Sequence, residues 1–325
     1  MKNRILIGDS FDPWHNLAVE ERLFDLLGED ECIFYLWQNK NTVVIGRHQN
    51  AWKECRTKLL EDEGGKLARR SSGGGAVFHD LGNLNFTFIL PREHYDVHRQ
   101  LNVIRRAVKT FGIDTEFTGR NDLVVTDSGA KFSGNAFRFS EHTGMHHGTL
   151  MVDVDMEKLG RYLAPGKDKL KAKGIESVRS RVCNLRALNP GIAIESLIPA
   201  LKEAFVAEYG PADEMSVSDV AGSDLNILEE KYASWDFRMG RALPFDATLE
   251  TRFAWGGITL ELSLKEGVIR DAQVFSDAMD DALVDRIAPA LTGVRYENVS
   301  LSRAMRTLSD PQTNELADWL EGHDL

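Results

Sequence analysis

The sequence predicts an α+β protein with a large domain over residues 1–245 and a small domain over residues 246–325. Its 325 residues exceed the usual size of a single hydrophobic core, so two domains are expected. Segments with strand-like and helix-like patterns are mixed along the first part of the chain. After Gly210 the composition becomes polar, and a block of strands followed by helices begins near Phe245.

The first helix has sequence signals at both ends. Asp12 can cap it, Pro13 suits the first helical position and Gly28 suits the end, so a helix over residues 13–27 is expected. A wide apolar stripe runs along this segment, with acidic residues largely on the other side. The stripe should therefore pack against a sheet.

A β-hairpin is expected after this helix, because the apolar segments 32–37 and 42–45 flank a turn-prone stretch. Further elements follow from the same periodicities and from glycines at helix ends. The expected strands cover residues 5–8, 75–79, 85–89, 122–125, 132–138, 149–152, 251–254, 258–264 and 268–275, with a turn at 265–267, and the expected helices cover residues 98–111, 156–163, 197–209, 279–291 and a segment up to 325.

Composition limits the classes of function. The formal charge of −11 argues against general nucleic-acid binding. The longest apolar run covers residues 32–37, which is too short to cross a bilayer, and no secretory leader is recognisable. The three cysteines, Cys32, Cys55 and Cys183, have no paired spacing, so neither disulfides nor a zinc site is indicated. We therefore expect a cytoplasmic protein without a membrane partner.

The densest special segment is RRSSGGGAVFHD, which begins at Arg69 and is followed by GNLN. Three consecutive glycines are unfavourable inside regular structure, which indicates a backbone that approaches a ligand closely. Amides exposed by such a loop can bind phosphate oxygens, and Arg70 can add a charge-assisted hydrogen bond. The alternative is a bulge or tight bend with surface arginines. No P-loop and no dinucleotide fingerprint is present, so a nucleotide would bind in another mode.

A second group of residues includes Lys131, in KFSGNA, and the pair His146-His147. The lysine ammonium can hold a carboxylate beside an α-phosphate, although most lysines simply lie at the surface. Neighbouring residues of a strand point to opposite faces, so the two histidines are not expected to share a metal ion. His94 and His98 have helical metal-ligand spacing but no glutamate between them at the required position, and they are interpreted as surface residues.

Taken together, these segments resemble the bacterial lipoate-protein ligase A family within the biotin and lipoate ligase superfamily. The resemblance also runs through DSFDPW, GRHQN, GRNDL and HHGTL, and it covers nearly the whole chain. It implies a large mixed-sheet catalytic domain with a small C-terminal accessory domain. The implied reaction converts lipoate and MgATP to lipoyl-AMP and pyrophosphate, and a carrier lysine then attacks the adenylate.

The resemblance also implies roles for individual residues. It assigns the nucleotide and adenylate to Arg70, Gly75, Ala76, Val77, Phe78 and Lys131, and the acid substrate to Ser72, Gly73, Gly74, His79, Lys131, Gly134 and His147. Lys131 is the implied catalytic residue. The basic segment 166–181, with a local charge of +4, is implied to order around the adenylate. Magnesium is implied without readable ligands, and Asp122 is the candidate residue.

The implied acceptors are lipoyl carrier domains of 2-oxoacid dehydrogenases and the glycine-cleavage H protein, and octanoate is a possible second acid. Three alternatives stay open. An octanoyl transferase would need a cysteine nucleophile, for which Cys183 is the candidate. A non-catalytic module would keep the fold and only bind lipoate or a carrier. A biotin ligase would share the adenylation chemistry.

Overall fold

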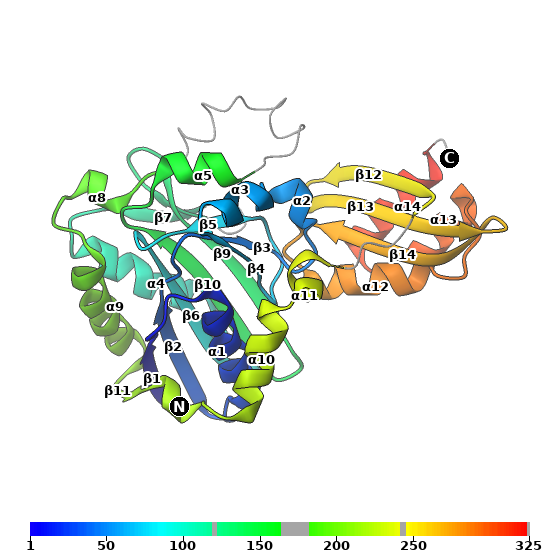
Figure 1. The fold of residues 1–325 in the computed structure, drawn as a ribbon. Coiled ribbons are helices and arrows are strands. Elements are labelled where there is room, and N and C mark those ends of the chain that lie inside the picture. Colours follow the sequence, from blue (N-terminus) through cyan, green and yellow to red (C-terminus); the bar gives the residue numbers. More distant parts are fainter. Residues whose placement is uncertain (119–121, 164–181, 241–244, 324–325) are drawn as a thin grey trace. The chain divides into compact units, whose positions relative to one another are not determined.

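The computed structural model describes residues 1–118, 122–163, 182–240 and 245–323. It divides into two compact units, coloured along the chain in Figure 1. The larger unit comprises Met1–Ile45, Ala51–Ser71 and Ala76–Arg238. The smaller unit comprises Gly46–Asn50, Ser72–Gly75 and Met239–Leu325. Two short loops from the N-terminal half of the chain therefore belong to the smaller unit.

An eight-stranded mixed sheet forms the centre of the larger unit. Its order is β11-β1-β2-β6-β10-β9-β8-β7; β1 pairs in parallel with β2 and β11, and the other pairs are antiparallel. The strands are β1 Lys2–Ile7, β2 Glu31–Trp37, β6 Asn83–Pro91, β7 Thr115–Thr118, β8 Asp122–Val125, β9 Lys131–Phe139, β10 Thr143–Met151 and β11 Ala212–Met215.

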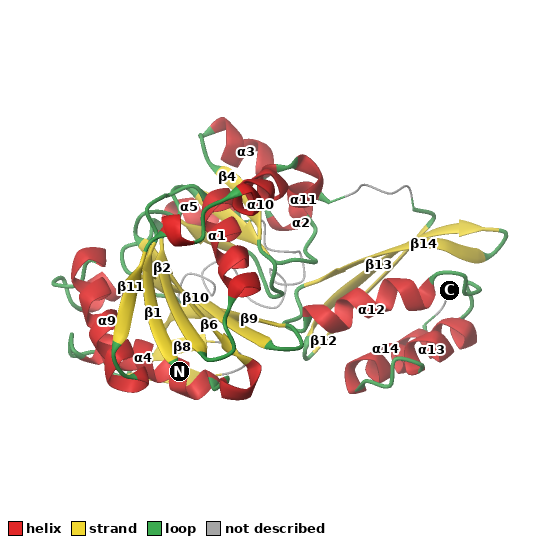
Figure 2. Ribbon diagram, turned by 90° about the horizontal axis from the view of Figure 1, so that it is seen from below, coloured by secondary structure: helices red, strands yellow, loops and turns green. Residues whose placement is uncertain are grey.

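Helices cover both faces of this sheet, as Figure 2 shows. α4 (Val97–Lys109) and α9 (Ile194–Tyr209) pack on one face, and α1 (Pro13–Leu26) and α10 (Ser223–Ala233) pack on the other. The alternation along β2 explains the two cores, because Cys32, Phe34 and Leu36 join the first and Ile33, Tyr35 and Trp37 join the second. Strands buried on both faces read as continuous apolar runs, as β2 does.

The predicted hairpin of residues 32–37 and 42–45 is wrong. β2 pairs with β1 and β6, whereas β3 (Thr42–Ile45) lies in a separate three-stranded sheet of order β4-β3-β5. The intervening residues do not form a tight turn, because the Asn16 side chain binds Gln38 O and Asn39 Oδ1. The partners of β3 are β4 (Lys66–Arg69) and β5 (Val77–His79).

The predicted helix over residues 13–27 is confirmed as α1, which ends at Leu26. Asp12 caps it by accepting a hydrogen bond from Trp14 N at 3.0 Å. The polar stretch after Gly210, to which the sequence patterns assign no helix or strand, contains β11 and α10. The remaining helices of the larger unit are α2 Ala51–Glu54, α3 Thr57–Asp62, α5 Met156–Tyr162, α8 Leu185–Leu188, α11 Trp235–Met239 and the short η1 Arg92–His94 and η2 Val217–Asp219.

The smaller unit carries strands β12 to β14 followed by three helices around its own apolar core. The turn between β13 and β14 is confirmed: Glu266 (φ 55°) and Gly267 (φ 73°) both adopt the left-handed conformation of a tight hairpin. Among the described helices of the chain, none is long and apolar enough to cross a membrane. The elements are β12 Ala247–Phe253, β13 Gly256–Lys265, β14 Val268–Ser276, α12 Asp281–Leu291, α13 Asn298–Arg306 and α14 Pro311–Glu321.

Candidate functional site

A pocket opens in the larger unit on the sheet face that carries α1. Two rows of paired residues across the central strands build its floor. One row joins Trp37, Asn85 and Thr149, and the next joins Thr87, His147 and Ala136. The lining residues are Leu17, Trp37, Val44, Arg70, Val77, His79, Asn85, Gly134, Ala136, His147, Gly148 and Thr149.

The pocket brings together Arg70, Val77, His79, Gly134 and His147, all of which were predicted as site residues. The other seven lining residues were missed. They come from β2, β3, β6, β9, β10 and α1, and only the pairing of strands far apart in the sequence places them together. Their one sequence signal is the alternation of side chains along each strand.

A buried polar network supports the floor of the pocket. Glu20 on α1 is 1% exposed, and its Oε1 accepts a hydrogen bond from Thr87 Oγ1 at 2.7 Å and lies 2.8 Å from His147 Nδ1. Trp37 Nε1 donates to Thr87 Oγ1 at 3.0 Å. These bonds fix the indole and imidazole rings that face the pocket, because a buried carboxylate is stable only with its donors in place.

The two arginines of the glycine-rich segment have different environments. Arg69 donates from Nε to Phe237 O at 2.8 Å and from Nη2 to Arg238 O at 2.9 Å, so its guanidinium holds α11. Arg70 lines the pocket and is 6% exposed. Burial lowers the pKa of Arg70 to about 10, and the nearby Glu20 opposes this shift. At neutral pH Arg70 therefore brings a poorly solvated positive charge to the pocket.

His79 is the second titratable group of the pocket wall. Its pKa is lowered to about 3 by burial and by electrostatic interaction with Arg70 and His147. Its Nδ1 lies 3.2 Å from Asn39 Nδ2. Among the described residues its Nε2 has no hydrogen-bond partner. His79 is therefore neutral at physiological pH and has one ring nitrogen available to a ligand.

The structure gives a different environment to each of the three consecutive glycines. A Cβ on Gly73 would lie 2.4 Å from Ala278 O, and Gly74 has a φ of 87° and donates from its N–H to Ala278 O at 2.9 Å. These two positions need glycine for packing within the smaller unit. A Cβ on Gly75 would meet nothing within 4 Å, so the space beside this residue is open.

Phe78 contributes to packing with its side chain. The residue is 4% exposed, and its ring centroid lies 5.5 Å from that of Tyr162 on α5. Ser72 is fully buried in the smaller unit, and its carbonyl accepts a hydrogen bond from Arg47 N. Neither residue lines the pocket, and neither does Ala76.

Lys131 begins β9 and forms an ion pair with Asp122, with Nζ 2.7 Å from Oδ1. Both side chains are about one-third exposed, so the pair contributes little to stability. A Cβ on Gly134 would lie only 2.9 Å from Lys131 Nζ. Lys131 is not among the residues that line the pocket, but its ammonium lies next to Gly134, which is. Cys183 N donates to Lys131 O at 2.8 Å, which attaches the strand start to the following chain segment.

The other histidines have structural positions. His146 is fully buried on the α4 side, with its ring nitrogens 2.8 Å from Gln100 Oε1 and Asn135 Oδ1, whereas His147 meets Glu20 on the α1 side. The prediction that this pair does not share an ion agrees with these opposite directions. His94 lies on η1 and His98 on α4.

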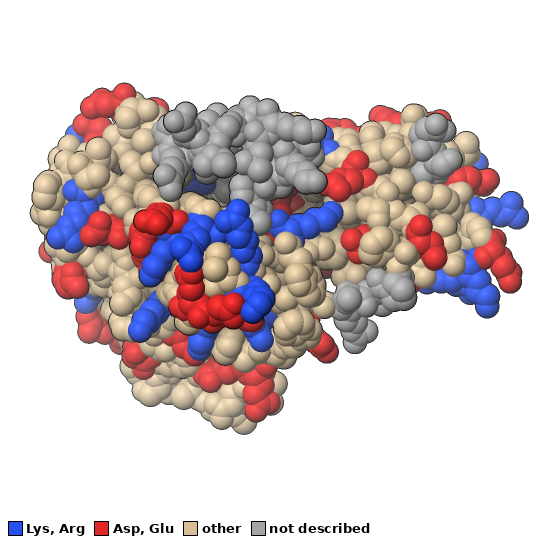
Figure 3. All heavy atoms as spheres, turned by 45° about the horizontal axis from the view of Figure 1, so that its top comes forward, with Lys and Arg blue, Asp and Glu red and all other residues tan. Residues whose placement is uncertain are grey.

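Charge is mixed on the surface. Figure 3 shows acidic and basic side chains interspersed on one face of the molecule. The basic segment 166–181 and residues 119–121 of the GRNDL motif lie outside the described residues. The described residues contain no group of three or more potential metal ligands among His, Cys, Asp and Glu.

Comparison with known families gives two matches along the chain. Residues 12–206 match the lipoyl protein ligase A/B catalytic domain, and residues 242–320 match the bacterial lipoate protein ligase C-terminus. The first match includes every pocket residue, and the second lies within the smaller unit.

Solved structures with the same fold include three ligases. LipL1 of P. falciparum, solved in complex with lipoate, is 28% identical with a TM-score of 0.86, and the match covers 99% of this chain and 100% of that one. A bipartite lipoate protein ligase of Thermoplasma acidophilum is 24% identical over 75% of this chain and 98% of its own, with a TM-score of 0.66. A lipoate-protein ligase A bound with ATP is 22% identical over 74% and 99%, with a TM-score of 0.63.

Proposed function

Because the chain belongs to the lipoyl protein ligase A/B catalytic domain family, we propose that it activates lipoate with MgATP and transfers the lipoyl group to carrier proteins. In the first step the lipoate carboxylate attacks the α-phosphorus of ATP, which gives lipoyl-AMP and pyrophosphate. In the second step a lysine amine of the carrier attacks the acyl carbon, an amide forms and AMP leaves. The C-terminal match to bacterial lipoate protein ligases supports this choice within the family.

The position of Lys131 carries the proposal. Its ammonium lies beside Gly134, which lines the pocket. A cation there can hold the lipoate carboxylate next to the α-phosphate, two anions that would otherwise repel each other. It also neutralises the charge that builds up as the carboxylate attacks.

The walls of the pocket favour an acid with an apolar body. Leu17, Val44, Val77 and Ala136 line it together with the Trp37 indole. An alkyl chain with a dithiolane ring gains free energy from burial there. Octanoate offers the same chain without the ring and is the second acid to test.

The remaining predicted roles are part of the same proposal. Arg70, which lines the pocket, would bind the phosphates through its guanidinium. The backbones of Gly75, Ala76, Val77 and Phe78 would contribute amides to nucleotide binding. Magnesium in nucleotide enzymes is commonly held by one or two carboxylates together with phosphate oxygens. Asp122, paired with Lys131, fits as one such carboxylate. When bound with ATP, the ion would supply charge neutralisation on the phosphates.

The proposed acceptors are lipoyl domains of 2-oxoacid dehydrogenases and the glycine-cleavage H protein, within a cytoplasmic route that salvages lipoate. The archaeal ligase from Thermoplasma acidophilum was solved as part of a system that includes its E2 lipoyl domain. That pairing supports an E2 domain as the first carrier to test.

Transfer of octanoyl through Cys183 is the second candidate. The geometry does not favour it: burial raises the pKa of the Cys183 thiol, and its Sγ lies 3.8 Å from Ala130 O. A thiol with a raised pKa holds less of the thiolate that would attack an acyl donor. A lipoate-binding module without catalysis and a biotin ligase remain as outcomes of the experiment.

The test is mass spectrometry of a purified lipoyl domain after incubation with the protein, MgATP and lipoate. We expect addition of one lipoyl group in the complete mixture and none when ATP or lipoate is omitted. Parallel reactions replace lipoate with octanoate or biotin. Modification only from octanoyl-carrier protein without ATP would instead establish the transferase, and no modification under any condition would leave only binding.

A further inference from the structure

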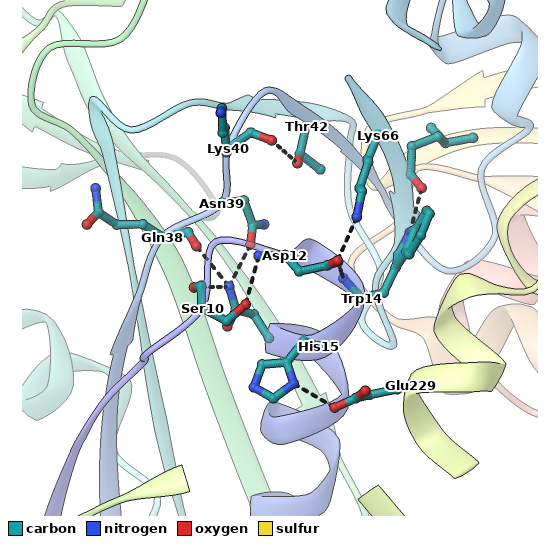
Figure 4. A network of polar contacts seen from close by, with 12 residues as sticks. Ser10, Asp12, Trp14, His15, Gln38, Asn39, Lys40, Thr42, Lys66 and Glu229 are labelled. Atoms are coloured by element: carbon teal, nitrogen blue, oxygen red, sulfur yellow. Dashed lines mark hydrogen bonds and ion pairs between the residues drawn. The ribbon is translucent and has the colours of Figure 1, made fainter. Parts of the chain in front are cut away.

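A row of hydrogen-bonded buried side chains leads from the start of α1 to the pocket. It consists of two asparagine amides followed by a histidine ring. Asn16, Asn39 and His79 are 0%, 0% and 3% exposed. Asn16 Nδ2 lies 3.0 Å from Asn39 Oδ1, and Asn39 Nδ2 lies 3.2 Å from His79 Nδ1. The dashed lines in Figure 4 mark the first hydrogen bonds of this row of side chains, around Ser10, Gln38 and Asn39. All of these residues belong to the larger unit.

The orientation of the Asn16 amide is fixed by backbone groups that can only accept. Its Nδ2 donates to Ser10 O at 3.0 Å and to Gln38 O at 2.8 Å. Its Oδ1 accepts from Tyr35 Oη at 3.3 Å. If this amide were flipped, its oxygen would face two carbonyl oxygens in a buried site. That arrangement is costly, so the nitrogen must face Asn39 as well.

The same reasoning fixes the next amide. The two hydrogens of Asn16 Nδ2 are shared among three oxygens at 2.8 to 3.0 Å, one of which belongs to Asn39. An Asn39 nitrogen in that place would face another amide nitrogen, so Asn39 presents its oxygen, Oδ1. Asn39 Nδ2 is then left to face His79 Nδ1. A protonated Nδ1 would place two donors against each other, so Nδ1 must carry the lone pair. In a neutral ring the proton then resides on Nε2.

His79 Nε2 is also the nitrogen that has no hydrogen-bond partner among the described residues, and His79 lines the pocket. Asn85 lines the same pocket, and its Nδ2 likewise has no partner within the described chain. A buried donor left unpaired costs free energy, so these groups are expected to be satisfied by a bound molecule.

We propose that Asn16 and Asn39 are positioning residues that lock His79 in its Nε2–H tautomer, so that the pocket presents a neutral N–H donor to an acceptor atom of the acid substrate or of its adenylate. This inference rests on the proposed function for the identity of the ligand. A neutral donor suits this position because the positive charge of Arg70 is already present in the same wall. The His79 N–H can therefore orient the ligand through a hydrogen bond and adds no second buried charge to the pocket.

The tautomer is measured directly by two-bond ¹H–¹⁵N NMR on the full chain with ¹⁵N-labelled histidine, using a His79→Gln sample to assign the signals. We expect a protonated Nε2 and an unprotonated Nδ1 for His79, with and without lipoate. In Asn39→Leu, which has a similar size but no amide, we expect the Nδ1–H form to appear. A wild-type His79 signal from the Nδ1–H tautomer or from an imidazolium would overturn the proposal, even if Asn39→Leu does not fold.

Binding by calorimetry tests the role of the donor. Glutamine at position 79 can place an amide N–H near the position of Nε2, whereas asparagine reaches only the position of Nδ1. We therefore expect His79→Gln to bind near wild-type affinity and His79→Asn to bind roughly tenfold more weakly, the loss of one buried hydrogen bond. Equal affinities for the two variants would contradict a ligand-facing donor.

A double-mutant cycle separates positioning from general support of the fold. Asn39→Leu should weaken binding roughly tenfold when position 79 is histidine, and much less when it is glutamine, which has no tautomer to select. Equal effects in both backgrounds would mean that Asn39 acts only structurally, and would refute the proposal.

Two ligands locate the acceptor. A loss already visible with lipoate alone assigns the acceptor to the acid, and a loss confined to a non-hydrolysable lipoyl-adenylate analogue assigns it to the adenylate. The proposed function is tested independently, because a protein that lipoylates carriers but has the other tautomer contradicts only this inference. A protein that neither binds lipoate nor modifies carriers contradicts the proposed function itself.

Discussion

Gly134→Ala should separate the position of the Lys131 ammonium from the stability of the fold. A Cβ at residue 134 would lie 2.9 Å from Lys131 Nζ and 3.1 Å from its Cε. Both atoms are at the end of a flexible side chain, so the lysine can move and the backbone need not. The displacement would pull the ammonium from its position 2.7 Å from Asp122 and away from Gly134, which lines the pocket.

The expected magnitudes differ for folding and for catalysis. The Lys131–Asp122 pair is about one-third exposed on both sides, so its loss should cost at most about 1 kcal/mol of folding free energy. Alanine in a strand recovers roughly 0.5 to 1 kcal/mol relative to glycine. Misplacing a catalytic group by about 1 Å, by contrast, can reduce a rate roughly 100-fold. We therefore expect an unchanged thermal midpoint and a loss of adenylation of about that size.

ATP–pyrophosphate exchange with lipoate measures adenylation, and thermal melting measures stability. Gly28→Ala is the matched control: its Cβ would meet only the Glu31 side chain, at the ordinary distance of 3.5 Å. Full exchange activity in a folded Gly134→Ala protein would refute the assigned role of Lys131. A loss of activity that merely follows unfolding would refute the reasoning about the flexible side chain.

Three further predictions follow from contacts described above. Arg69→Ala leaves two partly buried carbonyls without their charged donor and should lower the free energy of unfolding by roughly 3 kcal/mol, measured by urea denaturation; a loss below about 0.5 kcal/mol would contradict its structural role. Cys183→Ser should keep full ATP-dependent lipoylation, and complete loss would favour the thiol transferase. Burial lowers the pKa of His146 to about 3, so unfolding takes up a proton below about pH 6.5 and stability falls as the pH drops from 6.5 toward 3. Between pH 7 and pH 5, urea denaturation should show a drop that is smaller by about 2 kcal/mol in His146→Gln than in the wild type, and equal drops would exclude this histidine as a cause.

Sequence patterns identified the elements better than their partners. The caps and apolar stripe of α1 are local signals, and they placed this helix within one residue at its end. The pairing of β2 and β3 was mispredicted because nothing local distinguishes a hairpin from two strands of different sheets. The pairing of the two strands depends on long-range contacts, which include the hydrogen bonds of the Asn16 side chain to Gln38 and Asn39 in the connecting segment.

The same limit applies to the candidate site. The glycine-rich segment stands out in the sequence, so Arg70 and His79 were predicted to bind ligands, and both line the pocket. Trp37 and Glu20 were missed, because an indole in an apolar strand and a glutamate on a helix have no special spacing. Only the sheet register brings Trp37 into the pocket, and only the packing of α1 places Glu20 against Thr87 beneath it.

The hydrogen bonds beneath the pocket make substitution at Trp37 less costly than substitution at His147. Trp37 donates one hydrogen bond to Thr87, and the Thr87 hydroxyl also binds Glu20. A smaller residue at position 37 would therefore change the shape of the pocket and leave both hydrogen bonds of the Glu20 carboxylate in place. A change at His147 would deprive the buried Glu20 carboxylate of a partner, which is far more costly. New acid substrates should therefore arise through replacement of the tryptophan, while the histidine side stays fixed across descendants of this enzyme.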